Sequence, residues 1–394
     1  MEKLKVFTAF SGYDSQCIAL ERLASDFPGF AYELVGWSEI DRWAIEAHNA
    51  CFPQWADRNY GDISEIDWGE VPDFDLFTYS FPCQDISVAG HQNGLSEGSG
   101  TRSSLLWECE RAIASKRPKY LLMENVAALT HRKFVPQLMR WEDILSGYGY
   151  ANHRRVLNAS DFGVPQSRNR VFLVSLLDGI RFVFPTPVTP PHKQLEDLLD
   201  RDVDESYYFS DEYLHKCLLR IGNIPGKSRI RVVADAMVKG FCMQRRIYGT
   251  DGVSPTLTAN GHPIKVWESE AGAVPKVSES EHRKFQFRDP ADVAPTLCAS
   301  DYKCPCLAWY NGRVRKLTPG EYLRLMDVPE DKITAIQSHI CDNGKTISKS
   351  QQYKMAGNSI VVSVLYHIFR KMFTDRDTKS PIYRQLTIFD EIIQ

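Results

Sequence analysis

Long apolar runs, a basic leader and a regular cysteine framework are all missing from this 394-residue chain. No run of about eighteen apolar residues occurs, and no basic segment followed by an apolar stretch opens the chain, so neither a membrane span nor a secretory signal is expected. The ten cysteines have no regular spacing, which in a chain of this length indicates reduced thiols rather than disulfides. The sequence therefore predicts a soluble, cytoplasmic protein without a membrane partner.

Two cofactor signatures are also missing. Cys298, Cys304 and Cys306 form the nearest approach to a metal cluster, but they lack paired C-x-x-C spacing and a nearby histidine. We therefore expect no metal. The fingerprint G-x-G-x-x-G does not follow the first predicted strand, which argues against a nicotinamide-dependent enzyme.

A positive overall charge is lacking as well, because the formal net charge is -3. A basic coat over the whole protein is thereby excluded, yet the charge is distributed unevenly. Between Lys216 and Arg246 there are eight basic residues and one acidic residue, Asp235. This local excess is typical of phosphate contacts, although a solvated surface gives the same pattern.

The hydrophobic content of 43% is enough for a real core, and the length favours two domains. Short apolar runs alternate with helical patterns in the first part of the chain. Strands are predicted at residues 4–7, 33–37, 74–79, 120–123, 155–157 and 171–176. This alternation predicts an α/β fold with a mainly parallel sheet covered by helices, and an active site outside the carboxyl ends of its strands.

A domain boundary is predicted near residues 184–191, where prolines interrupt the alternation of apolar strand-like and helical segments. Periodicity is weak until about residue 310, and an apolar helical stripe over residues 360–369 then indicates packing onto the first domain. We expect a catalytic and cofactor-binding domain at residues 1–185 and a smaller, mixed domain at 186–310. Residues 311–394 are expected to return to the catalytic domain.

Cys83 is the first candidate for chemistry. It stands in the turn Ser80-Phe81-Pro82-Cys83-Gln84-Asp85, directly after a predicted apolar strand, and Pro82 restricts the backbone before it. A cysteine on such a turn can be exposed and activated. The competing interpretation is a small buried hydrophobic residue.

Glu124 and two arginines are expected at the same edge of the sheet. Glu124 ends the strand that begins at Tyr120, where desolvation can keep a carboxyl group protonated and able to donate a hydrogen bond. An acid at a helix N-terminus is the commoner alternative. Arg168 and Arg170 precede the strand at Val171 and offer guanidinium groups there, although arginines flanking a strand are usually solvated.

Together these segments resemble, in order and spacing, the motifs of the cytosine-5 DNA methyltransferases. Three segments resemble the cofactor motifs: Phe10-Ser11-Gly12, Glu39-Ile40-Asp41 and Gly61-Asp62-Ile63. Three resemble the catalytic motifs: Phe81-Pro82-Cys83-Gln84, Glu124-Asn125-Val126 and Gln166 to Arg170. Arg315 to Pro319 and Gly357-Asn358-Ser359-Ile360 resemble the closing motifs. The resemblance is to bacterial and phage enzymes, which act in restriction-modification systems or as orphans.

The resemblance implies a Rossmann-like, S-adenosylmethionine-dependent methyltransferase fold, with residues 186–310 as the target-recognition domain. It also implies a cofactor site made by Phe10, Ser11, Gly12, Glu39, Ile40, Asp62, Ile63, Pro82, Asn358 and Ser359. One departure concerns residues 13–16, because Tyr13-Asp14-Ser15-Gln16 follow Gly12 where the family has further glycines. How the methionine end of the cofactor is held is therefore open.

The mechanism implied by the resemblance is methyl transfer to carbon 5 of a cytosine rotated out of duplex DNA. Cys83 would attack carbon 6 of the ring. Glu124 would bond N3 of the base. Arg168 would hold the thiolate and the pyrimidine carbonyl, with Arg170 in support.

The expected partner is double-stranded DNA, with a cognate restriction endonuclease, acting separately, as a further candidate. The chain is expected to act as a monomer. The residues expected to contact DNA are Gln84, Ser87, Arg245, Arg246, Thr256 and Leu257. Thr296-Leu297 is the alternative to Thr256-Leu257 for the pair typical of the family's recognition domain. An RNA cytosine methyltransferase of the same fold and a non-catalytic DNA-binding relative are the rival functions.

Overall fold

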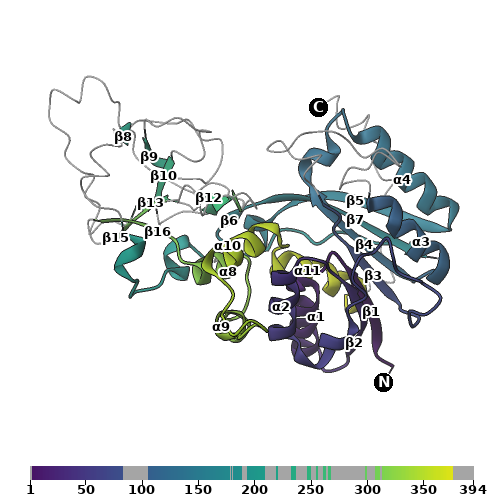
Figure 1. Cartoon of the computed structure of the whole chain (residues 1–394). Helices are drawn as coiled ribbons and strands as arrows, with labels where there is room; N and C mark the ends of the chain where they lie inside the picture. The colour runs from purple at the N-terminus through teal and green to yellow at the C-terminus, as the bar shows by residue number, and fades with distance from the viewer. Residues whose placement is uncertain are drawn as a thin grey trace.

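Figure 1 shows the computed structural model of the chain. It describes residues 2–82, 105–177, 179, 181–188, 193–208 and 315–375, together with the backbone of short strands between residues 219 and 316.

The larger sheet has six strands in the order β2-β1-β3-β4-β7-β5. Their bounds are β1 Leu4–Ala9, β2 Tyr32–Ser38, β3 Leu76–Tyr79, β4 Tyr120–Val126, β5 Tyr150–Asn158 and β7 Asn169–Leu177. Each of the six predicted strands is present. Strands β2, β1, β3 and β4 are parallel, as predicted, whereas β7 is antiparallel to β4 and β5 is antiparallel to β7. Residues 159–168 join β5 to β7, a connection too short for the helical crossover that parallel strands need.

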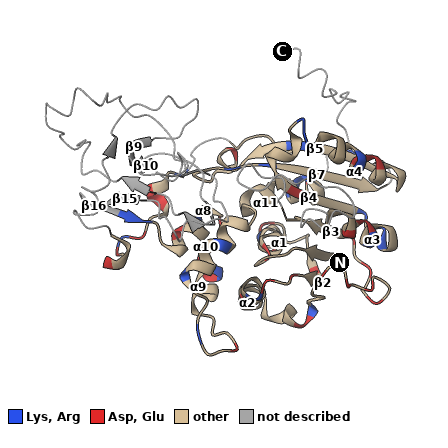
Figure 2. Ribbon diagram, turned by 45° about the horizontal axis from the view of Figure 1, so that its top comes forward, with Lys and Arg blue, Asp and Glu red and all other residues tan. Residues whose placement is uncertain are grey.

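Helices cover both faces of this sheet (Figure 1). The α-helices of the described residues are α1 Ser15–Asp26, α2 Arg42–Cys51, α3 Leu106–Lys116, α4 Val135–Gly147, α8 Pro319–Leu325, α9 Glu330–Ser338, α10 Lys349–Asn358 and α11 Val362–Phe373. Short 3-10 helices lie at η1 Pro53–Arg58, η3 Ala127–Thr130, η4 Ala159–Phe162, η5 Leu195–Leu198 and η6 Glu205–Tyr207. In Figure 2 the ribbon is coloured for charged residues mainly on helices such as α3 and α9, and the strands of the sheet are mostly uncharged.

Alternate residues of the strands supply two hydrophobic clusters, one on each face of the sheet, because successive side chains of a strand point in opposite directions. Val6 belongs to the cluster with α1 and α11, and its neighbour Phe7 belongs to the cluster with α3 and α4. The predicted stripe forms α11 with the two residues before it, and α11 packs against α1. The C-terminal elements therefore share a core with the first helix of the chain.

A second six-stranded sheet has the order β15-β16-β13-β10-β9-β8 and is mixed, because β10 and β13 are parallel and its other pairs antiparallel. Its strands are β8 Leu219–Arg220, β9 Val232–Ala236, β10 Arg246–Gly249, β13 Lys265–Trp267, β15 Leu307–Tyr310 and β16 Arg313–Lys316. Two small pairs join β6 Gln166–Ser167 to β11 Ser254–Pro255, and β12 Gly261–His262 to β14 Cys298–Ala299.

The limits expected for the domains remain predictions. β16 lies beyond the expected boundary at residue 310 yet belongs to the second sheet. Leu195 and Leu198 lie beyond the expected boundary at residue 185 yet pack in the same cluster as α1 and α11. Across the described part of the chain, every helix is too short or too polar to cross a membrane.

Candidate active site

The turn after β3 is tied to the neighbouring strand β4. The chain leaves β3 through Ser80 and the buried Phe81 to reach Pro82. The side-chain amide of Asn125, near the end of β4, donates a hydrogen bond to the carbonyl oxygen of Phe81 at 3.0 Å. The two segments predicted to carry catalysis are thus joined directly at the carboxyl ends of β3 and β4. Cys83, with Gln84 and Ser87, lies outside the described residues.

Glu124 is buried at this same edge and pairs with Arg170. In the antiparallel register of β4 and β7, Val126 lies opposite Arg170, so the end of one strand meets the start of the other. Arg170 Nε lies 3.0 Å from Glu124 Oε1. Burial raises the pKa of the Glu124 carboxyl above its usual value, although Arg170 and Arg168 act in the opposite direction. The carboxyl group therefore keeps its proton to a higher pH than an exposed glutamate would.

Arg168 makes different contacts from Arg170, although the two arginines are only two positions apart in the sequence. Its buried guanidinium donates from Nη2 to the carbonyl oxygens of Gly357, at 3.0 Å, and Ser359, at 2.6 Å. These two residues flank Asn358, the last residue of α10. Arg168 therefore holds the closing motif in place, while Arg170 contacts the buried carboxyl group. The roles expected for the two arginines stay predictions, and these contacts make Arg170 the nearer of the two to Glu124.

The segment Phe10-Ser11-Gly12 turns sharply after β1. Phe10 and Gly12 both have left-handed backbones, with φ of 55° and 62°. A Cβ atom built on Gly12 would meet no atom within 4 Å, so the backbone borders open space there. The amide of Gly12 donates to Glu39 Oε2 at 2.9 Å, which joins the first and second predicted cofactor motifs. Such a turn presents backbone rather than side chain to a ligand.

Tyr13 and Asp14, the first two of the four residues that follow Gly12, both point into the protein. Tyr13 is 1% exposed and Asp14 is fully buried. Asp14 caps α1 by accepting from the amide of Cys17 at 3.0 Å, and its other oxygen accepts from the Thr8 hydroxyl at 2.9 Å. These larger side chains therefore lie beneath the turn and leave the open space beside Gly12 unfilled.

Glu39 and Ile40 extend the same edge. Glu39 Oε1 accepts from the amides of Ile40 and Asp41, at 2.8 Å each, so three backbone amides fix this carboxylate. Ile40 is 68% exposed, so its apolar side chain is accessible to a ligand. An anchored carboxylate beside exposed apolar surface suits a ligand that has hydroxyl groups and a flat ring.

The remaining residues predicted for the cofactor differ in exposure. Asp62 is half-buried and its Oδ1 accepts from the backbone and hydroxyl of Ser64. Ile63 is 2% exposed within the cluster that contains Phe7, so it supports the site from below. Asn358 is exposed, and the Ser359 hydroxyl lies 2.7 Å from the Ser15 hydroxyl. The closing motif thus contacts the start of α1, beside the first motif.

The residues predicted to contact DNA are mostly outside the described part of the chain. Arg245, Thr256 and Leu257 are not described, and for Arg246 the structure gives only the backbone at the start of β10. β11 ends directly before Thr256 and pairs with β6, where Ser254 lies opposite Gln166 and Pro255 opposite Ser167. The first Thr-Leu candidate therefore follows a strand that lies beside a predicted catalytic motif.

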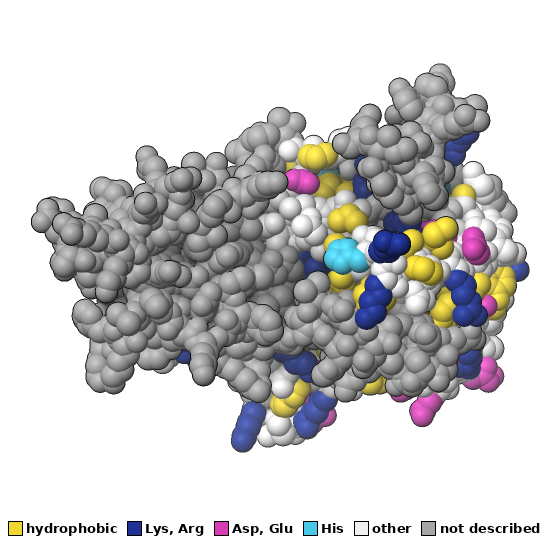
Figure 3. Space-filling view, turned by 90° about the horizontal axis from the view of Figure 1, so that it is seen from above, with side chains coloured by type: hydrophobic (Ala, Val, Ile, Leu, Met, Phe, Trp, Pro, Cys, Tyr) yellow, Lys and Arg dark blue, Asp and Glu magenta, His cyan; other side chains and the backbone are white. Residues whose placement is uncertain are grey.

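Figure 3 shows one face of the molecule from above. Among the described side chains on this face, Lys and Arg lie between hydrophobic groups and a histidine, with acidic groups mostly toward the margin. Mixed basic and apolar character is compatible with a polyanionic partner.

Sequence reasoning missed some contacts that build this edge. The motif Glu124-Asn125-Val126 did not indicate a separate role for Asn125, yet this residue ties the Phe81 turn to β4. The roles of Asp14 as a helix cap and of Arg168 as a clamp on residues 357–359 were also not foreseen. Asp14 carried a readable signal, because an aspartate before a helical pattern is a preferred N-cap.

The chain is similar in sequence to known proteins over most of its length. The family described as C-5 cytosine-specific DNA methylase matches residues 4–374. The chain is 32% identical to the Type II methyltransferase M2.ScrFI of Lactococcus lactis subsp. cremoris over 94% of this chain and 99% of that protein. It is 29% identical to the Orphan methyltransferase M.SPBetaI of Bacillus phage SPbeta, over 94% and 98% of the two chains.

Two solved structures share the fold. The Dnmt2 methyltransferase of S. pombe superimposes with a TM-score of 0.61 at 18% identity, covering 95% of this chain and all of that one. The methyltransferase EhMeth of Entamoeba histolytica gives a TM-score of 0.57 at 15% identity, covering 95% and 99%. The α/β methyltransferase fold predicted from the sequence is thereby confirmed.

Proposed function

The chain belongs to the C-5 cytosine-specific DNA methylases and is a DNA (cytosine-5-)-methyltransferase, and from this premise we propose how it works. We propose that it transfers a methyl group from S-adenosylmethionine to carbon 5 of a cytosine in a specific duplex sequence. The transfer proceeds through a covalent bond between Cys83 and carbon 6 of the base. The observation that carries the proposal is the buried Glu124–Arg170 pair, linked through Asn125 to the turn that leads to Cys83.

The residues at the edge formed by β1 and β2 fit the methyl donor. S-adenosylmethionine, when bound, supplies an electrophilic methyl group on a sulfonium. Gly12 leaves open space beside its backbone, and the Glu39 carboxylate is held by three amides where it can accept from ribose hydroxyls. Ile40, with 68% exposure, and Phe10 can flank an adenine ring. Asp62 can accept from the adenine amino group.

Cys83 supplies the covalent step. Carbon 5 of cytosine is a poor nucleophile, so a thiolate must first add to carbon 6 and push electron density onto carbon 5. The C–S bond forms as the ring double bond opens, and carbon 5 then takes the methyl group. Loss of the proton from carbon 5, to a base or water, restores the double bond and expels the Cys83 thiolate.

Glu124 and Arg170 stabilise the ring while Cys83 is attached. Because its pKa is raised, Glu124 can hold a proton and donate it in a hydrogen bond to N3, where negative charge develops. Arg170, 3.0 Å from the same carboxyl group, orients it and adds positive charge nearby. Arg168 fixes residues 357–359 and acts on the reaction through their position.

The target base must leave the duplex, because carbon 6 is unreachable inside the stack, and this costs about a few kcal/mol. Contacts to DNA must offset that cost. We propose that the basic segment from Lys216 to Arg246 and the region of the second sheet make these contacts to DNA. The proposed contact residues are Gln84, Ser87, Arg245, Arg246, Thr256 and Leu257. The pairing of β11 with β6 supports Thr256-Leu257 over Thr296-Leu297 as the recognition pair. The proposed setting is the cytoplasm of a bacterial or phage-infected cell.

Covalent trapping tests the proposal. A duplex library containing 5-fluorocytosine, incubated with the protein and S-adenosylmethionine, should give a denaturation-stable complex, because fluorine cannot leave as a proton does. Peptide mapping should locate the bond at Cys83. The Cys83→Ala variant should trap nothing and transfer no labelled methyl group, while its affinity for the unmodified duplex stays close to wild type.

Cys109→Ala is the matched control, because Cys109 is a buried thiol of the core whose pKa is raised by burial. It should still be trapped. Labelled methyl transfer by Cys83→Ala at the wild-type rate would remove the covalent mechanism. Trapping on a fluorinated RNA duplex but not on DNA would favour the RNA enzyme, and duplex binding without transfer by the wild type would favour the non-catalytic relative.

A further inference from the structure

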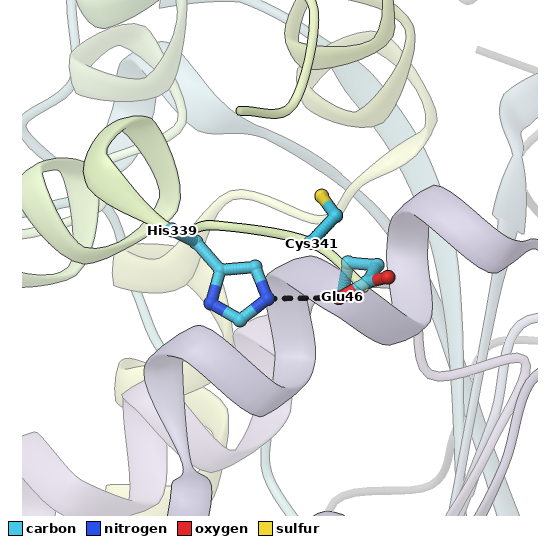
Figure 4. A group of neighbouring side chains, drawn as sticks. All are labelled: Glu46, His339 and Cys341. Carbon is cyan, nitrogen blue, oxygen red and sulfur yellow. Dashed lines mark hydrogen bonds and ion pairs between the residues drawn. The ribbon is translucent and has the colours of Figure 1, made fainter. Parts of the chain in front are cut away.

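Three side chains with metal-binding atoms converge between α2 and the segment that follows α9. Glu46 lies in α2, and His339 and Cys341 lie just after α9. One ligand atom from each falls within 4.8 Å of the others. His339 Nε2 is 2.8 Å from Glu46 Oε2, and Figure 4 shows the imidazole ring turned toward that carboxylate with the Cys341 side chain nearby.

Local backbone structure explains why His339 and Cys341 face the same way. His339 ends α9 with an extended backbone, and Ile340 forms a β-bridge with Thr346. Alternate residues of an extended segment point to the same side. Ile340, between them, is accordingly 61% exposed. The histidine and the cysteine therefore lie on the same side of this segment.

A tight turn also holds the cysteine in place. The Cys341 amide donates to the Lys345 carbonyl at 3.0 Å, and the Gly344 amide donates back to the Cys341 carbonyl at 2.8 Å. Gly344 has a φ of 72°, a conformation that glycine adopts without strain. The backbone that carries the Cys341 side chain is thus fixed by hydrogen bonds.

The donor set and its spacing suit one class of ion. Thiolate, imidazole and carboxylate are the ligands of zinc, at about 2.0–2.3 Å, which places the ligand atoms of a tetrahedral site roughly 3.3–3.8 Å apart. Because the three atoms lie within 4.8 Å of one another, the widest pair would close by no more than about 1 Å, and the Glu46–His339 pair, now at 2.8 Å, would open by about half that amount. Arg42 approaches the other oxygen, Oε1, at 3.9 Å, so Oε2 is the oxygen that faces the histidine.

We propose that Glu46, His339 and Cys341 form a binding site for zinc or a similar borderline divalent ion, with water as the fourth ligand. On binding, the thiol releases its proton to solvent and the histidine Nε2 exchanges its hydrogen bond for the metal. The ion joins α2 to the segment after α9 across 293 positions in the sequence. α2 begins next to Ile40, so the ion stabilises the base of the proposed cofactor edge without contacting substrate.

Metal binding by the full chain tests the site. We would treat the Cys83→Ala protein with a chelator and titrate it with Co²⁺, because this background removes the proposed nucleophile as a competing thiolate. The expected result is thiolate-to-cobalt charge-transfer absorption that saturates at one ion per chain. The additional change Cys341→Ser should abolish it. Cys51→Ser should keep the absorption, because Cys51 is a buried cysteine at the end of α2 that does not belong to the group.

Zn²⁺ calorimetry and thermal unfolding give a second readout. Cys341→Ser and His339→Gln should each weaken Zn²⁺ binding by more than about 10-fold, the smallest loss that even outer partners of a metal site cause. Zn²⁺ should raise the melting temperature of the parent protein and not that of these variants. His339 is partly exposed, so His339→Gln keeps the test decisive if Cys341→Ser fails to fold. Equal Zn²⁺ affinity in parent and variants, or no binding by the parent, would overturn the proposal.

Discussion

Two buried glutamate–arginine pairs in this protein have the same chemical groups and different surroundings. Glu321, at the start of α8, and Arg315, in β16, are both fully buried and make two contacts of 2.8 and 2.9 Å. Glu124 and Arg170 make one contact of 3.0 Å, and their side chains are 9% and 14% exposed. Burial raises the pKa of both carboxyl groups.

What separates the pairs is how completely each carboxyl group is bonded. Glu321 also accepts from the amides of Asp200, at 2.7 Å, and Thr318, at 2.6 Å, as part of the capping box that begins α8. Among the described residues, Glu124 has Arg170 and the Ser80 side chain as partners. A carboxyl group whose hydrogen-bonding sites are all used within the protein stabilises the fold. A partly exposed carboxyl group that can form a further hydrogen bond is able to bind a substrate.

The largest expected effect is a loss of stability when the Glu321–Arg315 pair is broken. Glu321→Gln leaves the buried Arg315 without its counter-charge, and breaking a buried pair in this way costs about 3–5 kcal/mol. Urea denaturation should show that loss. Glu330→Gln is the control, because Glu330 pairs with Arg324 but is 64% exposed, and its loss should cost less than about 1 kcal/mol. An equal loss of unfolding free energy in Glu321→Gln and Glu330→Gln would show that the buried pair contributes no more to stability than the exposed one.

The second largest expected effect is a loss of methyl-transfer activity when the Glu124–Arg170 pair is changed. Glu124→Gln keeps the size of the side chain but removes the acid that bonds N3, and methyl transfer should fall by roughly 10²–10³-fold, as for loss of one transition-state donor. The free energy of unfolding should change much less than in Glu321→Gln. Single-turnover transfer of labelled methyl to duplex DNA measures the rate, with duplex affinity as the control. Full activity in Glu124→Gln would refute its role.

Alanine variants of the two neighbouring arginines, Arg168 and Arg170, should affect different kinetic constants. Arg170→Ala should lower kcat by roughly 10- to 100-fold, the value of a hydrogen bond to a charged group. Arg168→Ala releases the carbonyls of Gly357 and Ser359 and should mainly raise the KM for S-adenosylmethionine. Steady-state kinetics with each substrate varied would show the split. The reverse result would restore the expectation that Arg168 is the arginine at the reacting groups.

The smallest effect is a pH dependence. Because its pKa is raised in the folded protein, Glu124 stays protonated to a higher pH than in the unfolded chain. kcat/KM should therefore be highest at low pH within the stable range and fall as the pH rises through the raised pKa. The associated contribution to stability is likewise present below the usual carboxyl pKa and lost as the pH rises through the raised value. Glu124→Gln should lack this descending limb in a pH–rate profile, and an unchanged limb would assign it to another group.

The larger sheet was predictable because strands buried on both faces give apolar runs, and each such run proved to be a strand. The reversed direction of β7 was not predictable from those runs. β7 is antiparallel to both of its neighbours, β4 and β5, because a short connection joins it to β5, while the other strands run in one direction, as the sequence pattern favoured. Apolar runs locate strands, and connections set their direction.

The family, the order of the motifs and the residue types that can do the chemistry could all be recognised from the chain alone, because these are properties of neighbouring positions. Which side chain meets which is set by the three-dimensional fold. It turned Tyr13 and Asp14 inward, directed Arg168 and Arg170 to different partners, and brought Glu46 to His339 and Cys341. The reason is physical, since the direction of a side chain depends on backbone register and on packing between segments that lie far apart in the sequence.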